Sequence, residues 1–288
     1  MLLMIENKIE TFLHSKTSKE SLFKDIEDTV EKNEAEQYLQ NAIADAEFTL
    51  NKIQPYLNKS LKILEVGGGL HLLSAYLYEN DYDITSLEPG NFNSFIDKLR
   101  ENVMKELNPK NTFSCKLEDF NANAKYDFIF SINVLEHTES VVEHIKLQTE
   151  LLRNSESKIL VRGPNYNLPF EPHFYKFFIP FLPNFTFKKI LKKKLIKDLG
   201  KQKYYDILNS LNFDCKFTVL NKNFKIKTFN PFIEIFQRLE NDKVFNERIL
   251  ENLFVNIIYK IISKFKVKIF NLIPKRFYPY LIIEIEKN

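Results

Sequence analysis

The stretch Leu61-Lys-Ile-Leu-Glu-Val-Gly-Gly-Gly-Leu-His-Leu72 decides the fold. A short apolar run from Ile63 to Val66 meets three consecutive glycines, and further apolar residues follow them. This pattern predicts a buried strand that turns sharply into a helix. Glycine is needed where a backbone turns tightly and lets a ligand come close, and the start of a helix offers unpaired N–H groups. The stretch therefore predicts a loop for a nucleotide-type ligand.

The composition limits the class of protein. The chain has 288 residues, of which 44% are hydrophobic and 27% charged, so it can bury a sizeable globular core. The 41 Lys and Arg residues against 38 Asp and Glu give a net charge of only +3, which argues against a dedicated nucleic-acid binder. Only two cysteines occur, far apart, and this indicates a reducing compartment rather than a disulfide scaffold or a zinc site.

The predicted location is the cytoplasm. The first residues, Met1 to Glu6, reach a charge too soon for a signal peptide. No stretch of 18 uncharged apolar residues is present to span a bilayer.

Residues 1–60 are polar and prone to form helices. Two apolar stripes at helical spacing predict two helices. Their members are Leu22, Phe23, Ile26 and Val30 in the first stripe, and Tyr38, Leu39, Ala42, Ile43, Ala46, Leu50 and Ile53 in the second. We therefore expect residues 1–60 to form a helical N-terminal cap and residues 61–288 to form the main domain.

From Leu61 onward, predicted strands and helices alternate. The expected strands are 61–66, 81–88, 112–117, 126–133 and 158–162, with helices to about Glu79, over 92–107 and up to Leu152. Strands this hydrophobic have no face left for water, so the alternation predicts an α/β, doubly wound, mostly parallel sheet. Because crossovers in such sheets are right-handed, Gly67, Glu88, Asp119 and Asn133 are expected at one edge.

The second half of the chain is less regular. Residues 164–199 are rich in Pro, Phe and Lys and predict a lid or a substrate-binding insertion. A helix near Gln202 to Leu211 and a strand from Asp214 to Leu220 are expected next. Residues 223–277 are predicted to form a second, mostly helical insertion before a final strand from Tyr280 to Lys287.

Two ligand classes share a glycine-rich turn followed by an acid at the end of the next strand. The dinucleotide fingerprint G-x-G-x-x-G requires a last glycine for close helix packing, but that place, counted from Gly67 and Gly69, is Leu72. Glu65 lies two residues before the first glycine, where an anionic pyrophosphate gains nothing from an acid. The pattern favours a cationic ligand over NAD.

Four motifs together resemble the class I S-adenosylmethionine-dependent methyltransferases. They are Ile63-Leu-Glu-Val-Gly-Gly-Gly69, Glu88, Asp119 and Ser131-Ile-Asn-Val-Leu-Glu-His137, in the family's order. The resemblance covers roughly residues 60–165 and the closing strands. It implies a Rossmann-like, seven-stranded sheet with an antiparallel last strand and S-adenosyl-L-methionine as the cofactor.

The resemblance also implies roles for individual residues. Gly67, Gly68 and Gly69 would pass beneath the methionine moiety, and Glu65 would help to hold that end of the cofactor. Glu88 would accept both ribose hydroxyls, and Asp119 would accept the adenine amine, although Glu118 could take the same role. Asn133 and Val134 would lie near the methyl donor. His71 stands where the family commonly has a third glycine, and we expect a helix-start residue there rather than a catalyst.

The loop from Gly163 to Phe174 is the main candidate for acceptor binding. Three prolines would rigidify a loop that presents Asn165, Tyr166, Glu171 and His173. Similar segments occur in methyltransferases of small-molecule or surface-glycan pathways. A hydroxyl acceptor needs a base, and the candidates are His173 and His137, because histidine titrates near neutral pH. For His137, local packing at a helix start is an equal alternative. No metal ligands are expected.

Two basic amphipathic stretches complete the sequence features. Lysines flank apolar residues over 188–197 and again over 254–269. Such helices can lie on an anionic membrane, although an apolar stripe packed on the domain is the commoner arrangement.

The predicted function is methyl transfer from S-adenosylmethionine to a hydroxyl or similar group. The similarity of the loop from Gly163 to Phe174 implies that the acceptor is a small molecule, a sugar or a lipid-linked glycan intermediate. Asn133 begins Asn-Val-Leu-Glu and lacks the Pro-Pro-aromatic signature, which disfavours amino methylation of bases. The alternatives are a Rossmann-type NAD-binding oxidoreductase and a catalytically silent binding module of the same fold. The binding module would associate with a membrane or a partner through the lysine-rich helices.

Overall fold

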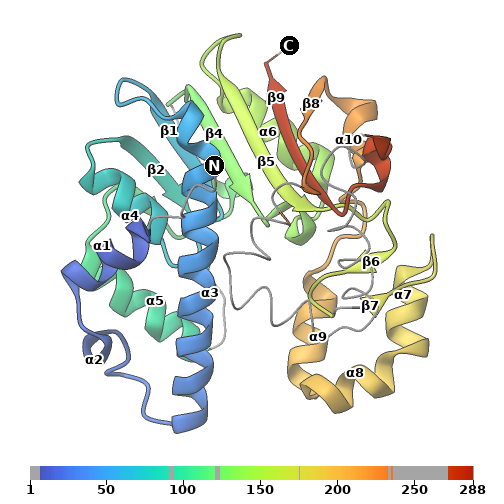
Figure 1. The fold of residues 1–288 in the computed structure, drawn as a ribbon, viewed down its shortest axis with the longest axis horizontal. Helices are drawn as coiled ribbons and strands as arrows, with labels where there is room; N and C mark the ends of the chain where they lie inside the picture. The colour runs from blue at the N-terminus through green and yellow to red at the C-terminus, as the bar shows by residue number, and fades with distance from the viewer. Residues whose placement is uncertain are drawn as a thin grey trace.

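The computed structural model describes residues 7–90, 94–120, 124–174, 176–232, 235 and 272–287. A seven-stranded sheet forms the centre of the molecule (Figure 1). In spatial order its strands are β3 (Thr112–Phe113), β2 (Asp83–Leu87), β1 (Lys62–Val66), β4 (Phe128–Ile132), β5 (Lys158–Pro164), β9 (Tyr280–Glu286) and β8 (Ile226–Thr228). The first five are parallel, and β9 runs antiparallel to both β5 and β8. The predicted doubly wound sheet with an antiparallel last strand is confirmed.

Alternate residues of each strand enter different cores, which is why both sheet faces are covered. One core joins Ile63, Phe128 and Phe130 to the helices shown in blue and teal in Figure 1. These helices are α1 (Lys8–Lys16), α2 (Lys19–Leu22), α3 (Thr29–Ile53), α4 (Leu72–Glu79) and α5 (Ser94–Leu107). The short helix η1 (Gln54–Tyr56) leads into β1.

The other face of the sheet carries the second core, in which Leu64 and Ile129 pack with side chains from the later helices. The helical elements in this later part of the chain are η2 (Leu117–Asp119), η3 (Leu135–His137), α6 (Val141–Leu151), α9 (Lys201–Ser210), α10 (Phe217–Asn223) and η6 (Lys275–Phe277). Between β5 and α9 the chain forms β6 (Phe170–Glu171), β7 (Lys176–Phe177), α7 (Pro183–Phe185), the π-helix η4 (Thr186–Ile190) and α8 (Lys192–Leu199).

Three sequence predictions require correction. The helix expected from the stripe of Leu22, Phe23, Ile26 and Val30 does not form as one element, because α2 ends at Leu22 and α3 begins at Thr29. The strand expected over 214–220 is wrong: Phe217–Asn223 is helix α10, and the edge strand is β8 at Ile226–Thr228. A short apolar run can fill a turn of helix or a strand, and periodicity does not separate them. The strand expected over 112–117 ends at Phe113, and its last residues enter η2. Most of the predicted helical insertion, residues 236–271, lies outside the described residues.

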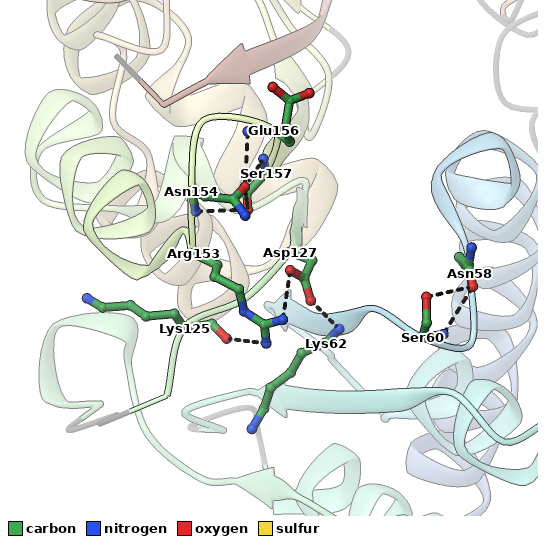
Figure 2. A network of polar contacts seen from close by, with 9 residues as sticks. All are labelled: Asn58, Ser60, Lys62, Lys125, Asp127, Arg153, Asn154, Glu156 and Ser157. Carbon is green, nitrogen blue, oxygen red and sulfur yellow. Dashed lines mark hydrogen bonds and ion pairs between the residues drawn. The ribbon is translucent and has the colours of Figure 1, made fainter.

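A polar network ties the strands together at the edge opposite the glycine turn (Figure 2). Asp127 accepts the backbone N–H of Lys62 at 2.8 Å and pairs with Arg153 at 3.1 Å. Asn154 closes the adjacent turn by accepting the backbone N–H of Glu156 at 3.0 Å. These contacts fix where β1 and β4 begin, and in register Val66 pairs with both Leu87 and Ser131. The carboxyl ends of β1, β2 and β4 therefore meet at one edge.

Candidate cofactor and acceptor site

The glycine turn is held in place by backbone contacts on both sides. The N–H groups of Gly67 and Gly68 both donate to the Leu87 carbonyl, at 2.8 and 2.9 Å, so the loop is fixed to the end of β2. Gly67 has a φ of +85°, and a Cβ there would lie closer than 3.0 Å to Val134 Cγ2. Gly69 also has a positive φ, of +54°, but a Cβ there would meet nothing within 4 Å. The turn thus packs tightly at Gly67 and is open at Gly69.

Glu65 and His71 belong to one buried chain of hydrogen bonds beneath the turn. Ser86 Oγ donates to Glu65 Oε2 at 2.6 Å and lies 2.9 Å from His71 Nδ1. Arg100 Nη2 donates to His71 Nε2 at 3.2 Å, so the proton of the neutral ring is on Nδ1. The hydrogen bonds therefore run from Arg100 through His71 and Ser86 to Glu65. A Cβ at Gly68 would lie 2.7 Å from His71 Nδ1. The absence of a side chain at Gly68 makes room for this network.

Burial shifts the pKa values of both titratable groups in this chain. Burial raises the pKa of Glu65 to about 7, although hydrogen bonds from Ser86 and Ser74 oppose the shift. Burial and the nearby Arg100 charge lower the pKa of His71 to about 3. His71 is the N-cap residue of α4, in the left-handed region with φ 58°, where the family's glycine would be unstrained. The prediction of a helix-start residue at His71 is confirmed.

Glu88 lies at the end of β2, next to the glycine turn. Its Oε2 accepts the Gly69 N–H at 2.9 Å and its Oε1 accepts the Gly90 N–H at 3.1 Å. Burial raises the pKa of Glu88, and these two hydrogen bonds and the Arg100 charge oppose the shift. Because each carboxylate oxygen has two lone pairs, one acceptor site per oxygen remains for a ligand. This is a suitable arrangement for a pair of ribose hydroxyls.

The two acids of η2 have different environments. Glu118 Oε1 bonds His144 Nδ1 at 2.9 Å. Both acids are exposed and line the same cavity as Glu88, so the His144 contact of Glu118 is what separates them. Of the two alternatives left by the sequence, the geometry favours Asp119 for the adenine amine.

The end of β4 contributes the wall opposite the glycines. Asn133 has a φ of 56°, and its Oδ1 accepts Arg162 Nη1 at 2.9 Å. Val134 packs over Gly67, as the close approach above requires. Both residues line the cavity.

These residues surround one cavity of about 890 Å³, which is in the range of sites for cofactors and drug-sized ligands. The predicted cofactor residues that line it are Glu65, Gly67, Gly68, Gly69, Glu88, Asp119, Asn133 and Val134. The open glycine at position 69, the two acceptor oxygens of Glu88 and the buried acid Glu65 fit a ligand with a diol and a cationic amino-acid end. The residues present therefore fit S-adenosylmethionine, which supplies a sulfonium methyl group when bound.

His137 and His173 line the same cavity, and the part of it that they border, where a methyl acceptor is expected, is called the acceptor end below. Their ring centroids are 5.5 Å apart. His173 Nδ1 bonds Glu171 Oε1 at 2.6 Å, and His137 Nδ1 lies 3.2 Å from the Ser210 carbonyl. Burial opposes the charged form of His173, but the Glu171 hydrogen bond and the charges of Glu171 and Glu136 outweigh it and raise the pKa.

The other predicted acceptor residues lie behind the cavity wall. Asn165 is buried and its side chain donates to the carbonyls of Arg276 and Tyr278, at 3.1 and 2.8 Å. Tyr166 is buried and donates to Glu171, which is itself fully buried. The structure does not bring Asn165 and Tyr166 to the cavity, because the chain turns inward after β5 to close the core. Glu171 acts on the cavity only through His173.

Sequence reasoning missed three contributors to this site. Helix α3 lines the cavity with residues from Tyr38 to Thr49, which the sequence pattern assigned only to a packed cap. Ser86 and Arg100 complete the chain of hydrogen bonds to Glu65, and nothing in their local sequence distinguishes them. Glu136 was quoted in a motif without a role, yet it is buried beside His137.

Comparisons with known proteins agree with this geometry. Residues 36–171 match the family model described as a methyltransferase domain. The uncharacterized protein Rv1509 of Mycobacterium tuberculosis (strain ATCC 25618 / H37Rv) is 33% identical over 158 residues, which are 52% of this chain and 51% of the relative. The protein MT1557 of strain CDC 1551 / Oshkosh matches with the same values. The chain thus spans about half the length of the curated relatives it matches.

Solved structures of methyltransferases are also similar. The plantazolicin methyltransferase BpumL in complex with SAH is 15% identical, with 99% of each chain covered and a TM-score of 0.47. The CcbJ methyltransferase from Streptomyces caelestis is 18% identical, covers 43% of this chain and 49% of its own, and has a TM-score of 0.34. The fold assignment rests on the strand order of the sheet. The match over residues 36–171 and this strand order are those of a methyltransferase domain on a Rossmann-like sheet.

Proposed function

We propose that this chain binds S-adenosylmethionine in the cavity and transfers its methyl group to an oxygen or similar nucleophile presented at His137 and His173. The observation that carries the proposal is the position of Glu88, whose two oxygens hold Gly69 and Gly90 and keep acceptor sites for a ribose diol. The buried acid Glu65 suits the cationic amino-acid end of the same ligand. The acceptor is proposed to be a small molecule, a sugar or a lipid-linked glycan intermediate.

Calorimetry with S-adenosylmethionine and S-adenosylhomocysteine tests the cofactor assignment. Glu88→Gln removes the charge that strengthens hydrogen bonds to the ribose hydroxyls, and affinity should fall about 10- to 100-fold. Glu79→Gln, at the exposed end of α4, is the matched control and should bind as the wild type does. Absence of binding to both ligands would overturn the proposal. Binding of a nicotinamide dinucleotide instead would favour the oxidoreductase alternative.

A screen of hydroxyl-bearing small molecules, sugars and lipid-linked sugars with labelled cofactor tests turnover. Each histidine of the acceptor end keeps Nε2 for contact with the acceptor's proton, since Nδ1 is engaged by Glu171 or Ser210. Methyl transfer also requires in-line approach of the nucleophile to the sulfonium methyl, which a fixed site favours. Cofactor binding without turnover on any acceptor class would instead support the silent binding module.

A lipid-linked acceptor is favoured by one surface of the second half of the chain. The turn from β7 into α7 exposes Phe181 (96%), and Ile179, Leu182 and Phe185 beside it are also exposed. Exposed lysines follow at once, including Lys188, Lys189 and Lys193. Apolar side chains next to cations are the combination that binds an anionic membrane surface. In the part of the chain that the structure describes, no helix is long and apolar enough to cross a bilayer.

Co-sedimentation with liposomes tests this surface. Phe181→Glu should abolish binding to vesicles that contain anionic lipid. Val30→Glu, which changes an exposed apolar side chain at the start of α3, is the matched control and should leave binding unchanged. If the wild type shows no salt-sensitive binding, the membrane contact is refuted while the cofactor assignment stands.

A further inference from the structure

The acceptor end of the cavity contains a cluster of three possible metal ligands. Glu136 and His137 come from η3, and His173 comes from the turn between β6 and β7. One ligand atom from each residue lies within 4.8 Å of the other two. Two of the three residues line the cavity, so the cluster borders the space where an acceptor would approach.

The hydrogen bonds of the two histidines fix which ring nitrogen is available. Glu171 and the Ser210 carbonyl are acceptors, so each must receive a proton from the Nδ1 that it contacts. The Nε2 of each neutral ring then carries a lone pair. Metal-binding histidines are oriented in this way, with the second nitrogen donating to a carboxylate or a backbone carbonyl. The two rings are therefore already in the ligand tautomer.

Glu136 provides an independent observation. The residue is only 1% exposed, and its Oε2 has no hydrogen-bond partner among the described residues. Residue 163, beside this oxygen, is a glycine, and a Cβ added there would lie 3.2 Å from Oε2. A buried carboxylate oxygen without a donor is costly unless a cation or a proton compensates it. A bound cation would therefore stabilise the cluster by compensating the Glu136 carboxylate.

We propose that Glu136, His137 and His173 bind a divalent transition-metal ion such as Zn²⁺ at the acceptor end of the cavity. Two imidazole nitrogens and one carboxylate oxygen suit such an ion, and three protein ligands leave positions open toward the cavity. This inference rests on the proposed function, because methyl transfer to a hydroxyl group requires coordination positions that the acceptor can occupy. A hydroxyl oxygen of the acceptor occupies one of them and loses its proton to solvent more readily.

The methyl transfer then balances without a further reactant. The acceptor O–H bond breaks as its proton leaves to solvent, and the oxygen forms the new O–CH₃ bond. The S–CH₃ bond of the sulfonium breaks, and its electron pair stays on sulfur to give the neutral thioether. In the metal-bound protein the histidines act as ligands, and the metal ion replaces a separate base because it lowers the pKa of the bound hydroxyl.

Metal titration of tag-free, chelator-treated protein tests the site. We expect one Zn²⁺ per chain by calorimetry, and Co²⁺ in its place should give the visible absorption of a nitrogen- and oxygen-bound ion. His137→Ala and His173→Gln should each weaken binding at least 100-fold. Glu171→Gln, which alters only the residue that orients His173, should weaken it about 10- to 100-fold. His14→Ala, an exposed histidine on α1, is the matched control and should bind as the wild type does.

Each outcome decides between the alternatives. Absence of a stoichiometric ion, or binding that survives in both His137→Ala and His173→Gln, overturns the metal site. Because both side chains are exposed at the cavity, their replacement is compatible with folding, and circular dichroism checks this. Cofactor calorimetry is run separately: metal binding without cofactor binding refutes the proposed function alone, and cofactor binding without metal refutes this inference alone.

Discussion

Replacing Gly67 with alanine is the sharpest test of how the glycine turn is built. The residue has a φ of +85°, and an added Cβ would lie closer than 3.0 Å to Val134 Cγ2. A left-handed conformation costs an alanine about 1–2 kcal/mol. Overpacking against Val134 adds about 1–3 kcal/mol. We therefore expect Gly67→Ala to lower the free energy of unfolding by about 2–5 kcal/mol.

Gly69→Ala is the matched control for the conformational part. Its φ of +54° carries the same kind of strain, but the new Cβ meets no atom within 4 Å. Its expected cost is about 1–2 kcal/mol. Val134→Ala removes the two Cγ atoms that Gly67→Ala would meet, so the double variant Gly67→Ala/Val134→Ala should recover the packing part of the loss and leave the strain.

Urea unfolding of the four variants, with the m-value compared in each, measures these differences. The coupling between positions 67 and 134 should be about 1–3 kcal/mol in the direction of rescue. Equal losses for Gly67→Ala and Gly69→Ala, together with no rescue by Val134→Ala, would refute the close approach of these two residues. Cofactor calorimetry on Gly69→Ala adds a second readout, since this variant should fold yet bind less well.

Three further predictions follow from the titratable groups. His71 has a pKa of about 3 in the folded protein, against an ordinary value of 6.5, so the native state binds fewer protons than the unfolded chain and stability should fall as the pH drops from 6.5 toward 3. Asparagine tolerates the left-handed backbone, so His71→Asn should remove about 2–3 kcal/mol of that fall between pH 7 and 4.5, measured by urea unfolding. Glu65, with a pKa raised to about 7, should lose its charge below pH 7, so cofactor affinity should weaken there in calorimetry. In Glu65→Gln the affinity should no longer change with pH in this range, and a pH dependence equal to that of the wild type would refute the assignment to Glu65. His173→Ala should reduce turnover about 10²-fold or more with cofactor affinity nearly unchanged, and a large loss of affinity instead would assign it a structural role.

The parallel centre of the fold was predictable because its strands are buried on both faces. β1, β2, β4 and β5 are buried along nearly their whole length, and each is followed by a glycine or a polar residue that marks the carboxyl edge. The edge of the sheet was harder. β8 has only three residues, and none of them is buried, so it lacks the signal that identified the inner strands.

The cofactor end of the site was predictable for the same local reason. Glu65, Glu88 and Asn133 follow or end strands at one edge, and strand register alone brings them together. The acceptor end depends on contacts between distant segments. Asn165 bonds carbonyls 111 and 113 residues away, which turns it from the cavity into the core. No local pattern contains that information.

Each end of the cavity has a buried carboxylate, and each carboxylate needs a positive charge or a proton to compensate it. Glu65 at the cofactor end and Glu136 at the acceptor end are each nearly free of exposure, and burial raises the pKa of both. Glu65 accepts Ser86, whereas Glu136 Oε2 has no donor within the described structure. The cofactor brings its own positive charge to Glu65 but leaves Glu136 uncompensated. Glu136 is compensated by its own proton, by a proton on His173 or by a metal ion, and the last two compete for the same nitrogen of His173. Metal affinity should accordingly rise with pH as His173 loses its proton, because a protonated imidazole cannot act as a ligand.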